Sequence, residues 1–218
     1  MKATFHKFLG TMDGLKNKKK ALLILIGLDI FMAIGSNIAD WPWLMSVKWY
    51  LMPVAPICSL YPLTLAIWFS LKYFNKKIPA WFTTFIYVGI TSYGIMAYIY
   101  YPLFMAWDGV EFRLIGNMVW VTVYALQSFI ILSELKILPT YQFVLIMSYF
   151  GFKDYADRFL GSFIDILRPD FPENLKNIFW ISIMVLHLTA GMAVVLIPIL
   201  KLKPAPQKMP STNASTSE

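Results

Sequence analysis

The sequence predicts an all-α fold: a polytopic integral membrane helix bundle with about six transmembrane helices and one amphipathic interfacial helix. The composition is 58% apolar and only 14% charged, whereas soluble domains average about 25% charged residues. Lysine and arginine residues gather between the apolar stretches rather than within them. A bilayer core about 30 Å thick needs roughly 20 residues of helix. The candidate spans lie near 20–37, 50–73, 80–104, 114–133, 138–153 and 177–200.

Residues 1–19 are predicted to form a basic cytoplasmic segment before the first span. Its lysines cluster beside the membrane, where each gains about 1 kcal/mol from anionic lipid headgroups. This headgroup-contact cluster consists of Lys16, Lys18, Lys19 and Lys20. We therefore attribute the net charge of +7 to lipid contact and expect no nucleic-acid partner. A signal peptide stays open as an alternative to a retained anchor.

Asp29 is the acidic residue that lies deep inside the first span. It follows Lys20 by nine residues, about 13 Å along a helix, which places it near the bilayer centre. A bare carboxylate there costs about 2.5 to 3.5 kcal/mol. Two interpretations stay open: a proton or cation relay, or a protonated carboxyl that is hydrogen-bonded across a helix interface. His187, inside the last span, would pair with Asp29 if the first and last helices pack together.

The second span begins with a proline-rich stretch. Pro53, Pro56 and Pro62 each remove a backbone donor and leave a carbonyl without its helical partner. This predicts a broken-helix segment, which membranes tolerate only against protein or a wet cavity and which often marks transporter sites. In the alternative interpretation Trp49 and Tyr50 form an interfacial aromatic belt, Pro53 and Pro56 start the helix, and only Pro62 kinks it.

The third and fourth spans are long and apolar, but the fifth is short. Because Pro139 lies near its start, a five-span chain stays open as an alternative. The positive-inside rule counts lysine and arginine. If the first span enters from the cytoplasm and six spans follow, thirteen of these residues lie on the cytoplasmic side and six outside. The prediction is a multi-pass protein of the cell membrane with both termini in the cytoplasm.

Residues 154–168 follow the fifth span and have apolar side chains at helical spacing with charges on the other face. This pattern predicts an amphipathic helix along the outer interface. Its outer interfacial cluster consists of Asp154, Asp157, Arg158 and Arg168. Asp154 and Asp157 are neighbours on a helix. They would either share a divalent cation with further oxygen ligands or form salt bridges, such as Asp154 with Arg158.

The bundle is predicted to extend over 20–203, and the polar, proline-rich tail 204–218 is predicted to be disordered. The lone Cys58 leaves no internal disulfide and no cysteine-based metal site. The sequence holds no nucleotide-binding glycine loop and no HExxH or GxSxG motif. We accordingly assign no cofactor, no metal site and no catalytic residue.

Four strings resemble a known pattern in their order and spacing. They are Trp49-Tyr-Leu-Met-Pro-Val-Ala-Pro56, which resembles WYLWPFVP; Tyr93-Gly94, similar to part of KYGIW; Asp154-Tyr-Ala-Asp157; and Arg168-Pro-Asp-Phe-Pro172, similar to HPxLP. These patterns are those of the YpjA-like family, small bacterial and archaeal membrane proteins without an assigned biochemical activity. The resemblance spans roughly 20–200 and implies a divergent member with the same architecture.

The chain departs from that family where the family has ionisable residues. Ile57 stands at an expected acidic position, Ser92 at a lysine and Arg168 at a histidine. The family's histidine and glutamate of the fourth span have Asn117 and Gln127 as their nearest polar counterparts. The resemblance therefore implies shared architecture more than shared chemistry.

Three functional hypotheses follow. The leading one is a non-enzymatic accessory or assembly component of a larger membrane complex, because the spans hold few ionisable groups and the loops are short. Its partners would be the lipid bilayer, with anionic headgroups on the cytoplasmic side, and other membrane subunits. The second is a small proton-coupled transporter or channel that uses Asp29 and His187. The third is a membrane-embedded enzyme that acts at the outer interface through Asp154 and Asp157.

Overall fold

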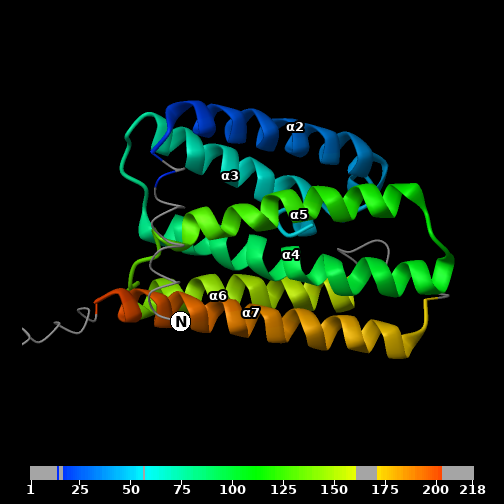
Figure 1. The fold of residues 1–218 in the computed structure, drawn as a ribbon. Coiled ribbons are helices and arrows are strands. Elements are labelled where there is room, and N and C mark those ends of the chain that lie inside the picture. The colour runs from blue at the N-terminus through cyan, green and yellow to red at the C-terminus, as the bar shows by residue number, and fades with distance from the viewer. Residues whose placement is uncertain (1–13, 15–16, 56, 161–170, 203–218) are drawn as a thin grey trace, which may run out of the picture.

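The computed structural model describes residues 14, 17–55, 57–160 and 171–202. Helices account for 83% of these residues and no strand occurs among them, so the all-α fold class is confirmed. The α-helices are α2 (Lys19–Leu44), α3 (Ile57–Tyr73), α4 (Ala80–Asp108), α5 (Phe112–Leu132), α6 (Thr140–Tyr155) and α7 (Glu173–Leu202) (Figure 1). Two short elements accompany them, a 3-10 turn η1 (Trp49–Leu51) and a π-helical turn η2 (Ala156–Leu160).

Four of these helices, α2, α4, α5 and α7, are long and apolar enough to cross a membrane, which supports a membrane location. By contrast, α3 has 17 residues and α6 has 16. At 1.5 Å per residue each is about 25 Å long, short of a hydrocarbon core of about 30 Å. The predicted count of about six spans is therefore not confirmed.

The outer faces of the helices carry large apolar side chains. Ile24 on α2, Leu145 on α6 and Leu188 on α7 are each more than half exposed. Soluble monomers rarely expose apolar patches larger than a few hundred Å². This outer surface suits a lipid environment.

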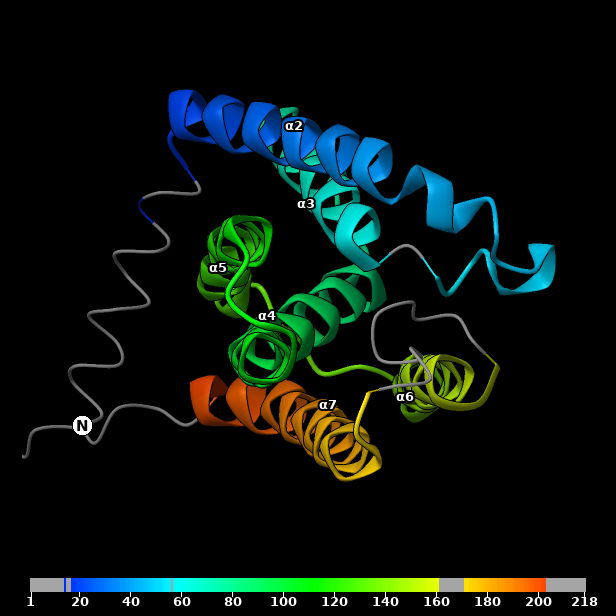
Figure 2. The same cartoon turned by 90° about the vertical axis from the view of Figure 1, so that its right-hand side faces the viewer.

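The long helices lie side by side, and α4 occupies the middle of the bundle (Figures 1 and 2). It contacts α3, α5, α6 and α7, while α2 packs mainly on α3. Within the candidate spans 67% of the α4 residues are buried but only 22% of those in α2. The interior of the protein is therefore organised around α4.

Small residues let the neighbours of α4 approach its backbone closely. A methyl group at Gly89 would overlap the ring of Tyr61, and one at Gly94 would overlap Ala125 of α5. Small residues at helix interfaces are the usual means of close packing in membranes. The space beside them is filled by aromatic rings, and Tyr61 stacks on Tyr93 with ring centroids 5.5 Å apart.

Two predicted boundaries need correction. The second span does not begin near residue 50, because residues 52–55 form turns and α3 begins at Ile57. The predicted separate interfacial helix is wrong for 154–160, because α6 continues through Tyr155 directly into η2. Residues 161–170, which include Arg168, lie outside the described residues. So do Lys16, Pro56 and the tail 204–218.

Candidate functional site

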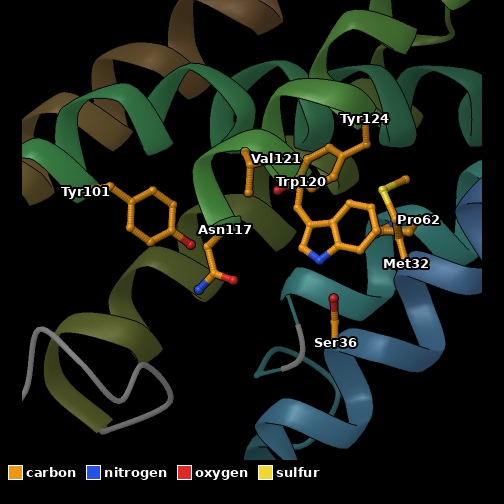
Figure 3. A pocket seen from close by; sticks show the side chains of 8 residues that line it. All are labelled: Met32, Ser36, Pro62, Tyr101, Asn117, Trp120, Val121 and Tyr124. Atoms are coloured by element: carbon orange, nitrogen blue, oxygen red, sulfur yellow. The ribbon is translucent and has the colours of Figure 1, made fainter. Parts of the chain in front are cut away.

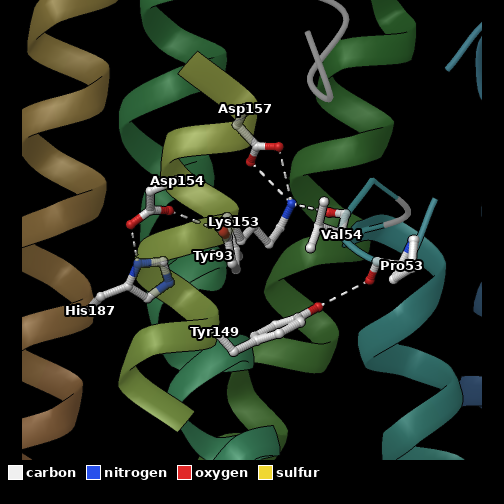
Figure 4. Close-up of polar contacts among 8 residues, drawn as sticks. All are labelled: Pro53, Val54, Tyr93, Tyr149, Lys153, Asp154, Asp157 and His187. Atoms are coloured by element: carbon white, nitrogen blue, oxygen red, sulfur yellow. Dashed lines mark hydrogen bonds and ion pairs between the residues drawn. The ribbon is translucent and has the colours of Figure 1, made fainter. Parts of the chain in front are cut away.

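Polar side chains from α4, α6, η2 and α7 meet beside the turn that precedes α3 (Figure 4). Ionisable groups inside a membrane bundle are costly, and they mark functional sites more often than structural ones. We call this group the α6 polar cluster. Its members are Tyr93, Tyr149, Lys153, Asp154, Asp157 and His187, together with the carbonyl groups of Pro53 and Val54.

The α6 helix places most of these side chains because of their spacing. Tyr149, Lys153 and Asp157 follow one another at intervals of four residues, and residues four apart lie on the same helix face. Asp154 is adjacent to that line and faces α7 (Figure 4). The α6 helix and the turn that continues it therefore contribute side chains to both parts of the cluster, the Lys153–Asp157 pair and the Asp154–His187 pair.

The first half of the cluster is a buried ion pair. The ammonium group of Lys153 donates to both carboxylate oxygens of Asp157, at 3.2 and 3.0 Å, and to the carbonyl of Val54. Lys153 is 0% exposed and Asp157 is 1% exposed. The cost of removing both charges from water is offset only when such hydrogen bonds are made. The neighbouring Tyr149 hydroxyl donates to the carbonyl of Pro53 at 3.2 Å.

The second half of the cluster is a histidine–carboxylate pair. His187 Nδ1 lies 2.8 Å from Asp154 Oδ2, and the Tyr93 hydroxyl donates to Asp154 Oδ1 at 3.4 Å. His187 Nε2 is buried and has no partner among the described residues. A carboxylate that accepts from Nδ1 fixes the orientation of the imidazole. The other ring nitrogen is then the one that is left to bond another group.

A groove of about 420 Å³ borders this second half between α6 and α7. Its lining is mostly apolar, but it includes Asp154, His187 and Arg158. Arg158 donates to Glu173 at the start of α7, and also to Asn177 at 3.3 Å. The Asp154–His187 pair therefore lies in the wall of a groove that opens on the apolar outer surface.

Asp29 lies elsewhere, on α2, and is fully buried. Its Oδ1 accepts from Gln127 Nε2 of α5 at 2.9 Å. The suggested pairing of Asp29 with His187 is wrong, since His187 is bonded to Asp154 instead. Asp29 Oδ2 and Gln127 Oε1 have no partners among the described residues.

A small cavity of about 20 Å³ lies between α2 and α5 (Figure 3). Such a volume holds about one water molecule. Ser36, Asn117 and Tyr124 contribute polar groups to its lining, and Pro62 of α3 also borders it. Asp29 is not part of this lining. Of the prolines in the predicted broken-helix segment, Pro53 lies in the turn before α3 and Pro62 lies inside α3.

The structure separates the two aspartates that were expected to act together. Asp154 bonds His187 and Asp157 bonds Lys153, so neither carboxylate is directed at a shared cation. In the described part of the chain no group of three or more His, Cys, Asp or Glu side chains could hold a metal ion. The expected salt bridge between Asp154 and Arg158 is also replaced, because Arg158 pairs with Glu173.

The lysines expected at the headgroups, Lys18, Lys19 and Lys20, are exposed at the start of α2. Sequence reasoning missed Lys153, which it counted among the outer lysines, and Tyr149. One signal for Lys153 is present in the sequence, since Lys153 and Asp157 have the four-residue spacing of a helical ion pair. Hydropathy alone does not reveal that this pair is turned inward.

No protein-family model matches the chain, and comparisons with curated proteins and with solved structures gave no match. The resemblance to the YpjA-like family stays a prediction. Three of the strings on which it rests contribute to the α6 polar cluster, through Pro53 and Val54, through Tyr93, and through Asp154 and Asp157.

Proposed function

We propose that this chain is a small proton-coupled transporter of the cell membrane and that the Asp154–His187 pair is its proton-binding site. The observation that carries the proposal is the 2.8 Å contact of His187 Nδ1 with Asp154, with Nε2 lacking a partner among the described residues. Each of the two ring nitrogens of histidine can carry a proton. A buried histidine held by a carboxylate is therefore suited to bind and release one proton.

The charges around the pair support this role. Lys153 and Asp157 neutralise each other in the same cluster. The net charge of the cluster is then set by Asp154 and His187: it is negative when the imidazole is neutral and zero when it is protonated. Because a net charge is costly in a low-dielectric interior, protonation changes the stability of the buried site. This change can couple to the movement of another molecule.

Of the two interpretations left open for Asp29, this proposal takes the carboxyl that is hydrogen-bonded across a helix interface. Its bond to Gln127 joins α2 to α5, and such a bond contributes about 0.6 kcal/mol on average in a membrane protein. We assign Asp29 to helix association rather than to proton transfer.

The test is proton flux into liposomes that contain the purified protein and a trapped pH-sensitive dye. We expect Asp154→Asn and His187→Gln to lower the flux by about a hundredfold, in the range of lost acid–base groups. Asp29→Asn is the matched control, because it alters a buried carboxyl outside the α6 polar cluster, and it should keep the flux. Equal flux in His187→Gln and the native chain, or no flux in the native chain, would overturn the proposal.

An accessory or assembly component of a membrane complex is the second candidate. The largely exposed apolar surface of α2 favours it, since only 22% of that span is buried and a neighbouring subunit would cover the rest. A pull-down in mild detergent followed by mass spectrometry tests it. Subunits that co-purify in fixed ratio would support this role, and a lone protein would exclude it.

We also propose that the chain crosses the membrane six times with both termini in the cytoplasm. The salt bridge of 2.8 Å between Lys72 of α3 and Glu134, just after α5, supports one shared side for the ends of these two helices. Reporter fusions test the proposal. Reporters after residue 203 and in the loop 74–79 should be cytoplasmic, whereas one at Gly109 should be external. An external reporter after residue 203 would indicate an odd number of crossings.

A further inference from the structure

We infer that the groove between α6 and α7 binds a single-chain amphiphile with an acidic head group, either a carboxylate or a phosphate. The inference deepens the proposed function by naming the class of molecule that would be transported. The claim that this molecule is transported rests on the proposed function. The claim that it binds rests on the groove alone.

The groove has the size and the apolar lining of a site for an acyl chain. Its volume is about 420 Å³, within the range of about 300 to 1,000 Å³ for small-molecule sites. Met147 from α6 and Met184 and Leu188 from α7 line it. Because the outer faces of both helices are apolar, an acyl chain can enter the groove from the surrounding lipid.

Two polar atoms in the wall of this groove lack hydrogen-bond partners within the described part of the chain. Both His187, which is 3% exposed, and Trp180, which is 6% exposed, line the groove. His187 Nε2 and Trp180 Nε1 are buried and have no hydrogen-bond partner among the described residues. Buried polar groups are nearly always bonded, and those that are not call for a bound water, ion or ligand. Neither atom is exposed in the structure, so neighbouring side chains must move slightly for a head group to reach them.

The chemistry of these atoms selects the head group. An indole N–H can only donate, so the ligand must offer an acceptor to Trp180. Arg158, a cation, lines the same groove. Its partner Glu173 has a side chain that is 60% exposed, and such surface pairs contribute little. An anionic head group can therefore share or replace that pairing.

Other head groups fit less well. An alcohol offers an oxygen to Trp180 but leaves Arg158 without an anion from the ligand. An ammonium group cannot accept from Trp180, and Arg158 repels it. The carboxylate of Asp154 also lines the groove, but it already bonds His187 and Tyr93. Charge-assisted hydrogen bonds are roughly twice as strong as neutral ones, so the acid should bind best.

The test uses the whole chain in lipid nanodiscs with single-chain amphiphiles that are brominated on the tail. Bromine quenches nearby tryptophan, and the signal of Trp180 is the difference between the native chain and Trp180→Phe. Four probes of equal chain length are compared: a carboxylate, a lysophosphatidic acid, an alcohol and an amine. Two groove variants complete the set, Gly151→Leu and its control Gly116→Leu. Both glycines are exposed and have open space where a Cβ would stand, but only Gly151 lines the groove.

We expect saturable quenching of Trp180 by the carboxylate or the phosphate probe, with affinity about tenfold or more above the alcohol and amine. Whichever of these two probes binds more tightly shows whether the head group is a carboxylate or a phosphate. Gly151→Leu should weaken binding by at least tenfold and Gly116→Leu should leave it unchanged. Equal quenching by all four probes, or equal binding in the two leucine variants, would overturn the inference. Selective binding without proton flux would refute the proposed transporter function but support the amphiphile site. Proton flux without binding would support the transporter function and refute the amphiphile site.

Discussion

The ion pair between Lys153 and Asp157 allows a quantitative prediction. Replacing Lys153 with methionine keeps the length of the side chain but removes three hydrogen bonds, two to Asp157 and one to the carbonyl of Val54. Asp157 is 1% exposed, so its charge stays buried after it loses the ammonium group that offsets it. Breaking a buried pair in this way costs about 3 to 5 kcal/mol. We expect Lys153→Met to lower the free energy of unfolding by that amount, measured by reversible unfolding in detergent.

The double variant Lys153→Met, Asp157→Leu is the control for this reasoning. With both charges removed the pair is replaced by apolar groups, a change that is often neutral or even stabilising. The bond to the Val54 carbonyl is also lost in this variant, at about 1 to 3 kcal/mol. The double variant should therefore be more stable than Lys153→Met alone. If the single variant lost less than about 1 kcal/mol, as an exposed pair does, the buried ion pair would be refuted.

Substitutions at three further positions test the packing of the bundle by thermal unfolding in detergent. Asp29→Asn keeps an acceptor oxygen for Gln127 and should change stability by less than about 0.5 kcal/mol. Asp29→Leu removes that acceptor and should cost about 1 kcal/mol. Equal losses of stability in the two variants would exclude the bond. Gly94→Ala should cost about 1 to 3 kcal/mol, because its methyl group overlaps Ala125, and a neutral result would contradict the close approach of α4 and α5. Tyr149→Phe removes one hydroxyl donor and should cost about 1 kcal/mol; no loss would show that water or another donor replaces it.

Hydropathy predicted the helices because each one satisfies its own backbone and needs only an apolar sequence. The third span, expected at 80–104, is α4 at Ala80–Asp108, and the fourth, expected at 114–133, is α5 at Phe112–Leu132. The second span was placed too early because Trp49 to Ala55 are as apolar as a helix. In the structure these residues form a 3-10 turn and further turns.

The candidate site could be predicted only in part, because its bonds join helices that are distant in the sequence. Sequence analysis singled out Asp29, Asp154 and His187, but it joined the wrong two. Which pair forms depends on how α6 packs against α7 and α2 against α5, and hydropathy carries no information about this. Lys153 was counted among the six outer basic residues because it ends the fifth predicted span, which runs from the cytoplasm outward.

The turn before α3 and the α6 polar cluster form one structural unit. Pro53 has no N–H, and residues 52–55 are not helical, so their carbonyls need donors from outside the turn. In lipid no water supplies them. Tyr149 and Lys153 of α6 donate to two of these carbonyls, and Lys153 in turn holds Asp157 in η2. A π-helical turn is rare and often lies at a functional site. Lys153 therefore stabilises two irregular backbone segments, the turn before α3 and η2. A change in the turn before α3 should be transmitted through Lys153 to Asp157.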